Sequence, residues 1–137
     1  MTDQTTRLVL PSHIEAVAEA AAAVASFAQN CGVGDEAAFG IDIAVREAVT
    51  NAIVHANNED DTKSIEVSFN CAGRALEIDV KDQGEGFDPA SVPDPTAPAN
   101  LLKTSGRGIF LIRNFIDEVR WSSRPEGGTM LHMVKRF

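Results

Sequence analysis

One strand-like segment that ends in a carboxylate constrains the fold more than any other feature of this chain. Apolar and charged residues alternate from residue 76 to residue 81, which is the period of a half-buried strand. One further step places Asp82 on the core face, where a carboxylate needs a hydrogen-bond donor because leaving it unpaired costs several kcal/mol. Gly84 and Gly86 follow, and glycine lets a ligand approach the backbone closely. The segment predicts a pocket for a group with an N–H donor, such as adenine, or alternatively an exposed Asx-type turn.

The rest of the pattern alternates between strands and helices and predicts an α+β fold. Strands are expected at 7–10, 64–70, 75–81, 119–122 and 129–135, and helices at about 13–29, 35–57 and 106–116. Helices that are segregated from an antiparallel-rich sheet form a two-layer α/β sandwich. We therefore expect a mixed, mostly antiparallel sheet with helices on one face. Residues 1–137 are expected to form a single domain, because this length is ordinary for one domain and no internal repeat is present.

Local signals predict how the first two helices begin and where a long loop lies. Ser12 and Glu15 have the spacing of a capping box, and Asp35 is expected to cap the second helix. The first helix is rich in alanine, and its expected core face consists of Ile14, Val17, Ala18, Ala21, Val24 and Ala25. Residues 88–105 contain four prolines and predict an irregular loop that is functional or mobile.

The second helix carries three polar residues at four-residue intervals, Glu47, Asn51 and His55. Residues four apart stack on one face of a helix. Beside this stripe lies a predicted apolar arc of Ile41, Ala44, Val45, Ala48, Val49, Ala52 and Ile53. The stripe is therefore expected at the boundary between core and solvent. A carboxylate can act as a base, an Asn oxygen suits Mg²⁺ and a His can donate to phosphate, but an ordinary amphipathic helix has the same pattern.

Gly106, Arg107 and Gly108 precede an apolar run and predict a helix start with little side chain over its first amides. Such amides, together with the helix dipole, suit a phosphate group. Glycines also open helices for packing reasons, and an arginine such as Arg107 is more often a solvated surface charge than a phosphate clamp. A glycine pair directly before Thr129 predicts a hairpin turn.

The charge composition argues against nucleic acid as a direct partner. The net charge is −8, from 12 basic and 20 acidic residues, and no run is rich in Lys or Arg. No segment reaches the ~20 apolar residues of a membrane span, and the first residues do not resemble a signal peptide. Cys31 and Cys71 lack metal-ligand spacing and are expected to be reduced thiols. We therefore expect a cytoplasmic protein that binds neither membrane nor nucleic acid.

Several short motifs occur in an order that resembles the GHKL ATPase family. Glu-x-x-x-Asn at 47–51 is followed by Asp-x-Gly-x-Gly at 82–86, the proline-rich segment 88–105, Gly-x-Gly at 106–108 and Gly-Gly-Thr at 127–129. The resemblance implies a Bergerat-type ATP-binding fold in which residues 88–105 form the ATP lid. Segments 46–55 and 109–119 look most like the small anti-sigma factor serine/threonine kinases of bacterial partner-switching systems.

The resemblance also implies roles for individual residues. Asn51 corresponds to the asparagine that ligates Mg²⁺, which binds the ATP phosphates. Glu47 corresponds to the acidic residue proposed to accept the proton of the attacking hydroxyl. Asp82 matches the aspartate that accepts the adenine amino proton, and Gly84 and Gly86 match the glycines that shape this wall of the pocket.

The remaining matches concern both ends of the nucleotide. Thr129 resembles the threonine that assists at the adenine, often through water. Gly106 and Gly108 match the glycines at the end of the lid, near the phosphates. His55 falls where the kinase branch often has a basic residue, and Arg107 occupies a variable position beside the phosphates.

Taken together, the resemblance implies an ATP- and Mg²⁺-dependent anti-sigma factor with serine/threonine kinase activity. Such a protein is expected to be a homodimer, to bind an RNA polymerase sigma factor and to phosphorylate a STAS-domain anti-anti-sigma protein. A nucleotide-gated binding module that changes partners without phosphoryl transfer remains the alternative. Glu47 favours the enzyme, because a mere binder needs no base beside the Mg²⁺ site.

Overall fold

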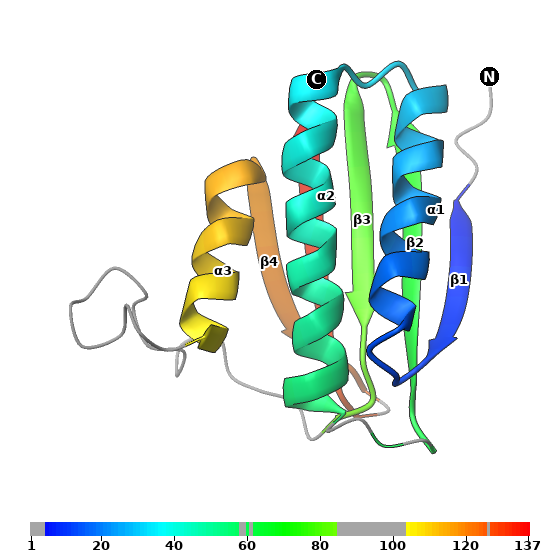
Figure 1. Cartoon of the computed structure of the whole chain (residues 1–137), viewed down its shortest axis with the longest axis vertical. Helices are drawn as coiled ribbons and strands as arrows, with labels where there is room; N and C mark the ends of the chain where they lie inside the picture. The colour runs from blue at the N-terminus through cyan, green and yellow to red at the C-terminus, as the bar shows by residue number, and fades with distance from the viewer. Residues whose placement is uncertain (1–4, 58–59, 61, 85–103, 126) are drawn as a thin grey trace.

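The computed structural model describes residues 5–57, 60, 62–84, 104–125 and 127–137. Its elements are β1 (Thr6–Pro11), α1 (Ala16–Asn30), α2 (Asp35–Thr50), the π-helix η1 (Asn51–Ala56), β2 (Ser64–Ala72), β3 (Ala75–Lys81), α3 (Thr104–Phe115), β4 (Glu118–Ser123) and β5 (Thr129–Arg136). Figure 1 shows the helices on one side of the sheet, with α2 between α1 and α3. The predicted α+β class and the two-layer arrangement are confirmed.

The sheet has five strands in the order β1-β2-β3-β5-β4. Each of the four neighbouring pairs is antiparallel, so the strands that the structure describes contain no parallel pair. The strands of the β2–β3 and β4–β5 hairpins, and the turn before Thr129, agree with the sequence predictions. β3 occupies the centre of the sheet, and its end at Lys81 delivers Asp82 next to the start of β5.

The core lies between the helices and the inner face of the sheet. Every residue of the predicted apolar arc of α2 and η1 is buried, as are the alternating apolar residues of β2 and β3. This agreement has a simple cause, because the period of each element matches its hydrophobic pattern and leaves one face to bury.

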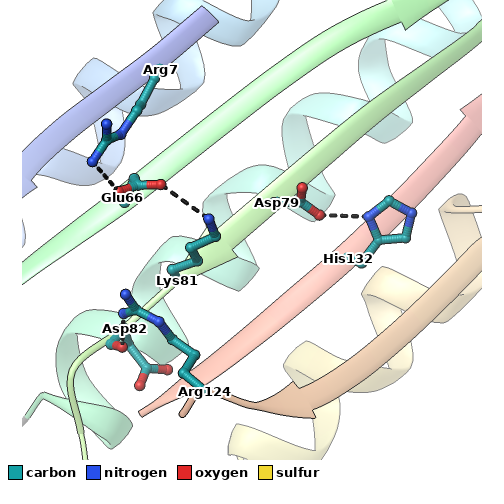
Figure 2. Close-up of polar contacts among 7 residues, drawn as sticks. All are labelled: Arg7, Glu66, Asp79, Lys81, Asp82, Arg124 and His132. Atoms are coloured by element: carbon teal, nitrogen blue, oxygen red, sulfur yellow. Dashed lines mark hydrogen bonds and ion pairs between the residues drawn. The ribbon is translucent and has the colours of Figure 1, made fainter. Parts of the chain in front are cut away.

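The outer face of the sheet is polar and carries ion pairs between neighbouring strands (Figure 2). Glu66 on β2 contacts Arg7 of β1 at 2.7 Å and Lys81 of β3 at 3.2 Å. His132 Nδ1 on β5 lies 2.5 Å from Asp79 Oδ1 on β3. Charged residues on this face alternate with the buried ones of the inner face, as expected for a sheet covered by helices on one side.

The predicted helix caps are wrong. α1 begins at Ala16, and its N-terminal flanking residue Glu15 makes no side-chain capping bond. Ser12 is buried and donates instead to the backbone oxygen of Lys63 at 3.0 Å, because a buried hydroxyl needs a partner wherever the fold provides one. Gly34, not Asp35, precedes the first turn of α2, although Asp35 keeps the favourable position of an acid in that turn.

The predicted core face of α1 is wrong in part. Val24 and Ala21 are buried, but Ile14 is 49% exposed and Ala18 and Ala25 face solvent. The buried side is instead made by Ala16, Ala20, Ala21, Val24 and Ala28. A helix in which most positions are alanine has little contrast between faces. Its rotation is therefore decided by contacts with the sheet, such as the edge-on packing of Phe27 on Phe69 at 5.0 Å.

Two helix boundaries also differ from the expectation. The second helix continues to residue 56 as predicted, but residues from Asn51 onward form a π-helix, a rare form that is frequent at functional sites. α3 begins at Thr104, so Gly106 and Gly108 lie inside its first turns. Among the helices of the described ranges, none is long and apolar enough to cross a membrane.

Candidate functional site

Asp82 is held at the end of β3 by backbone amides. Its side chain is only 7% exposed, as the alternation of the strand predicts. Oδ1 accepts hydrogen bonds from the amides of Gly84 at 3.1 Å and Thr129 at 3.0 Å. Both amides therefore bond the same carboxylate oxygen. Among the described residues, no buried side-chain polar atom lacks a hydrogen-bond partner. The second oxygen, Oδ2, is a further acceptor, because each of the two oxygens of an ionised carboxylate can accept hydrogen bonds.

Burial raises the pKa of the Asp82 carboxyl above its ordinary value. The amides of Gly84 and Thr129 and the charge of Arg124 act in the opposite direction, because each favours the ionised form. Perturbed carboxylates of this kind are concentrated at functional sites. This carboxylate combines low exposure with an oxygen that two backbone amides hold in place.

Two glycines let the backbone approach Asp82 and η1 more closely than a side chain would allow. A Cβ added at Gly84 would lie 2.2 Å from the backbone oxygen of Ala56. A Cβ added at Gly128 would lie 2.1 Å from the backbone oxygen of Asp82, and Gly128 has a φ of +94°. The glycines are therefore required for packing around the carboxylate.

Glu47, Asn51 and Gly108 form a second group, at the other end of η1. Glu47 and Asn51 are half-buried, as expected for the boundary of the helix. A Cβ added at Gly108 would lie 2.9 Å from Glu47 Oε2 and 3.5 Å from Asn51 Nδ2. The fold thus brings a glycine from α3 against the polar stripe of α2, across more than fifty residues of sequence.

The π-helix η1 connects the two groups. Asn51 is its first residue, and Ala56, its last, contacts Gly84. A helix rises about 1.5 Å per residue, so the two ends of η1 lie less than roughly 8 Å apart along its axis. One short element therefore carries the polar stripe at one end and supports the Asp82 loop at the other.

The oxygens of Glu47 and Asn51 fit a hard cation bound mainly through a ligand. In the described residues, no group of three or more His, Cys, Asp or Glu side chains could hold a metal by itself. Mg²⁺ usually keeps several waters and takes one or two protein oxygens together with substrate phosphates. A carboxylate and an amide side by side meet that requirement.

Some predicted site residues lie outside the described part of the chain. Gly86 and residues 88–103 of the expected lid fall in this category, whereas Thr104 and Ser105 belong to α3. The side chains of His55 and Arg107 are not described, and Gly106 is described only as part of the α3 backbone. The roles of these residues stay predictions.

Two polar residues that support the site were missed in the sequence. Arg124 Nη1 donates to the backbone oxygen of Asp82 at 2.6 Å, from the loop between β4 and β5 (Figure 2). Asn57 is fully buried, and its Oδ1 accepts from the amide of Gln83 at 2.9 Å. Arg124 lies in a turn-like segment and Asn57 directly after a helix, where such residues are ordinarily solvated. No local signal distinguished either residue.

This arrangement is that of an ATP-binding domain. Residues 10–135 match the histidine kinase-like ATPase domain family, and the chain belongs to that family. It uses the α+β fold of this class for ATP-dependent chemistry.

Two relatives define the branch more closely. The chain is 30% identical over 132 residues to the serine-protein kinase RsbW of Oceanobacillus iheyensis, covering 92% of this chain and 82% of the relative. It is 33% identical over 133 residues to the anti-sigma F factor of the same organism, covering 95% of this chain and 90% of the relative. The predicted resemblance to small anti-sigma factor kinases is thereby confirmed, and the chain is a protein kinase.

Solved structures support the same fold. The RsbU and RsbW domains of Rv1364c from Mycobacterium tuberculosis match with a TM-score of 0.69 and 20% identity, over 97% of this chain and 32% of that one. The catalytic domain of the histidine kinase ThkA matches with a TM-score of 0.59 and 14% identity, over 99% of this chain and 97% of that one.

Proposed function

We propose that this kinase is an ATP- and Mg²⁺-dependent anti-sigma factor that phosphorylates a protein partner on Ser or Thr. Its proposed partners are an RNA polymerase sigma factor and a STAS-domain anti-anti-sigma protein, which would place it in the cytoplasm. The names of its relatives, a serine-protein kinase and an anti-sigma F factor, support both activities. The observation that carries the catalytic assignment is the packing of Gly108 against Glu47 and Asn51.

Adenine recognition is assigned to the Asp82 group. Oδ2 of Asp82 accepts a hydrogen from the adenine amino group, while Oδ1 stays bonded to the amides of Gly84 and Thr129. Thr129 is buried beside this carboxylate, in the position expected for a second contact at the base. Because the pocket wall is made of backbone held close by glycines, the flat base can approach it without a side chain intervening.

Phosphoryl transfer is assigned to the Glu47 group. The side-chain oxygen of Asn51 would hold Mg²⁺, which when bound would neutralise charge on the ATP phosphates. Glu47 accepts the proton of the Ser or Thr hydroxyl as that oxygen bonds to the γ-phosphorus and the bond to the β–γ bridging oxygen breaks, releasing ADP. Gly108 presents no side chain toward either residue, so its backbone lies close to both.

The direct test is incubation of the full chain with γ-labelled ATP, Mg²⁺ and candidate STAS-domain proteins. We expect label on a Ser or Thr of one such protein, and loss of label when Mg²⁺ is chelated. Nucleotide-dependent binding of the partner with no label on it would contradict transfer and support the switch module that changes partners without chemistry.

We further propose that the chain is a homodimer, as expected for small kinases of this branch. Ala18, Ala22 and Ala25 form a smooth exposed surface on α1, away from the nucleotide residues. Light scattering of the purified chain tests this, and a monomer at micromolar concentration would contradict it.

A further inference from the structure

A buried asparagine, Asn57, joins four separate segments directly behind the proposed adenine pocket. Its Nδ2 donates to Ser12 Oγ at 2.7 Å and to the backbone oxygen of Ser64 at 3.1 Å. Its Oδ1 accepts from the backbone amide of Gln83 at 2.9 Å. The side chain thereby connects the end of η1 to the segment before α1, the start of β2 and the loop that follows Asp82.

The orientation of the Asn57 amide is determined by its partners. The Ser64 carbonyl can only accept, so it requires the NH₂ group, and the Gln83 amide can only donate, so it requires the oxygen. Neither an aspartate nor an aliphatic side chain can satisfy both. The backbone amide of Asn57 also donates to Ala52 at 2.9 Å, which closes η1 by a bond across five residues.

The loop between Asp82 and Gly84 is held from two sides. From the sheet, Thr129 bonds the carboxylate of Asp82 and Arg124 bonds its backbone oxygen. From the helix, Asn57 bonds the amide of Gln83, the residue between Asp82 and Gly84, and Gly84 packs on the Ala56 carbonyl. The contacts from the helix side connect this loop to η1, the element that begins at Asn51.

We propose that Asn57 is a positioning residue for adenine recognition, acting through the Gln83 amide on the loop that carries Asp82. The inference rests on the proposed function, in which Asp82 accepts the adenine amino group. Without Asn57, the partly buried Gln83 amide and Ser64 carbonyl lose their partner and the loop shifts to find others. The Asp82 carboxylate is then displaced from the position in which it contacts the adenine while the phosphates occupy their own site.

The test compares Asn57→Ala with Ser12→Ala in the full chain. Ser12→Ala removes another member of the same buried network but leaves the Asn57–Gln83 bond intact, so it controls for loss of stability. We measure affinities for ATP, ADP and GTP by calorimetry, well below the unfolding temperature. Asn57→Ala is expected to weaken ATP about tenfold and to reduce the preference for ATP over GTP. The ratio of ATP to ADP affinity, which reports the phosphate side, should stay at the wild-type value.

Ser12→Ala is expected to lower the unfolding temperature and to keep the preference for ATP over GTP. An unchanged preference in folded Asn57→Ala would overturn the proposal, as would an equal loss in Ser12→Ala. If Asn57→Ala does not fold, Gln83→Ala decides. Gln83 is exposed and its Oε1 accepts from the Ser64 amide at 2.7 Å, so this change loosens the same loop mildly. A partial loss of the preference for ATP over GTP in Gln83→Ala supports the proposal, and a preference equal to that of the wild type overturns it.

Asp82→Ala in the same titration separates the positioning role of Asn57 from the assignment of the adenine site. If Asp82→Ala loses adenine preference and Asn57→Ala does not, only the positioning role fails. If Asp82→Ala binds ATP as the wild type does, the adenine site itself is assigned wrongly.

Discussion

Gly108 and Glu47 are in contact across the interface between α3 and α2, and a methyl group at Gly108 would lie 2.9 Å from Glu47 Oε2. This separation is shorter than real side-chain contacts, so Glu47 or the helix must move to admit the methyl group. The relationship joins the predicted base, Glu47, to a glycine that was predicted to end the lid, and neither residue indicates the other in the sequence.

Gly108→Ala should therefore reduce phosphoryl transfer while preserving the fold. In a helix interior, alanine is favoured over glycine by about 1 kcal/mol, which offsets part of the strain. We expect at least roughly a tenfold loss of transfer, because the methyl group displaces the Glu47 carboxylate from the position proposed for the base. Gly34→Ala is the control, since a Cβ there meets no atom within 4 Å. Transfer by Gly108→Ala at the wild-type rate would remove Gly108 from the site.

Substitutions at Glu47 and Asn51 should impair different steps, phosphoryl transfer and ATP binding respectively. A positioned general base contributes about 10²–10⁴-fold, so Glu47→Ala is expected to lose most transfer and to retain ATP affinity. Asn51→Ala should weaken Mg²⁺-dependent ATP binding, because the metal connects this side chain to the phosphates. Calorimetry and single-turnover transfer measure the two effects separately. Arg46→Ala is the matched control, since its exposed pair with Asp42 at 3.0 Å contributes little.

Asp82→Asn should lose ATP without losing stability. The Asn oxygen can keep the two amide bonds now made to Oδ1, which turns the NH₂ group toward the adenine amino group, so two donors meet. We expect ATP affinity to fall at least roughly tenfold. The free energy of unfolding at neutral pH should equal or exceed that of the wild type, because no charge is buried.

The stability difference between Asp82→Asn and the wild type should depend on pH. Because burial raises the pKa of Asp82, the folded protein retains this proton where the unfolded chain has lost it. The wild type therefore loses stability as pH rises from the ordinary aspartate pKa to the raised value. Above the raised pKa, Asp82 makes no further pH-dependent contribution to stability. The free energies of unfolding of the wild type and of Asp82→Asn, measured with denaturant across this pH range, should converge at low pH. A difference between the two free energies that does not change with pH would mean that burial does not destabilise the ionised Asp82 carboxylate.

Phosphorylation of the STAS partner should weaken its complex with the kinase. A phosphoryl group adds a charge of about −2 to the partner, and the kinase already carries a net charge of −8. We expect the unphosphorylated partner to displace a bound sigma factor and the phosphorylated one to be a weaker competitor, with a difference that shrinks at high salt. Competition binding at about 50 mM and about 300 mM salt, where the Debye length is roughly 14 Å and roughly 6 Å, provides the measurement. Equal affinity for both forms would contradict the partner-switching model.

The sequence by itself determined the elements whose hydrophobic period matches their geometry. The alternation of β3 placed Asp82 on the core face, and the apolar arc of α2 and η1 predicted seven buried positions and a polar stripe at their edge. These features depend on residues two to four positions apart, so local patterns contain the necessary information. The order of the short motifs then identified the family, because each motif lies on its own element.

Only the tertiary structure decided features that depend on contacts between distant segments. The alanine-rich α1 has no local contrast that defines its buried face, and Ser12 satisfies its hydroxyl on Lys63 in place of a helix cap. The placement of Gly108 on Glu47 likewise arises where α3 packs on α2. Asn57 and Arg124 hold the Asp82 loop through backbone groups, and any residue type can supply a backbone group. A sequence pattern therefore gives no indication of such bonds, whereas burial in the folded chain requires them.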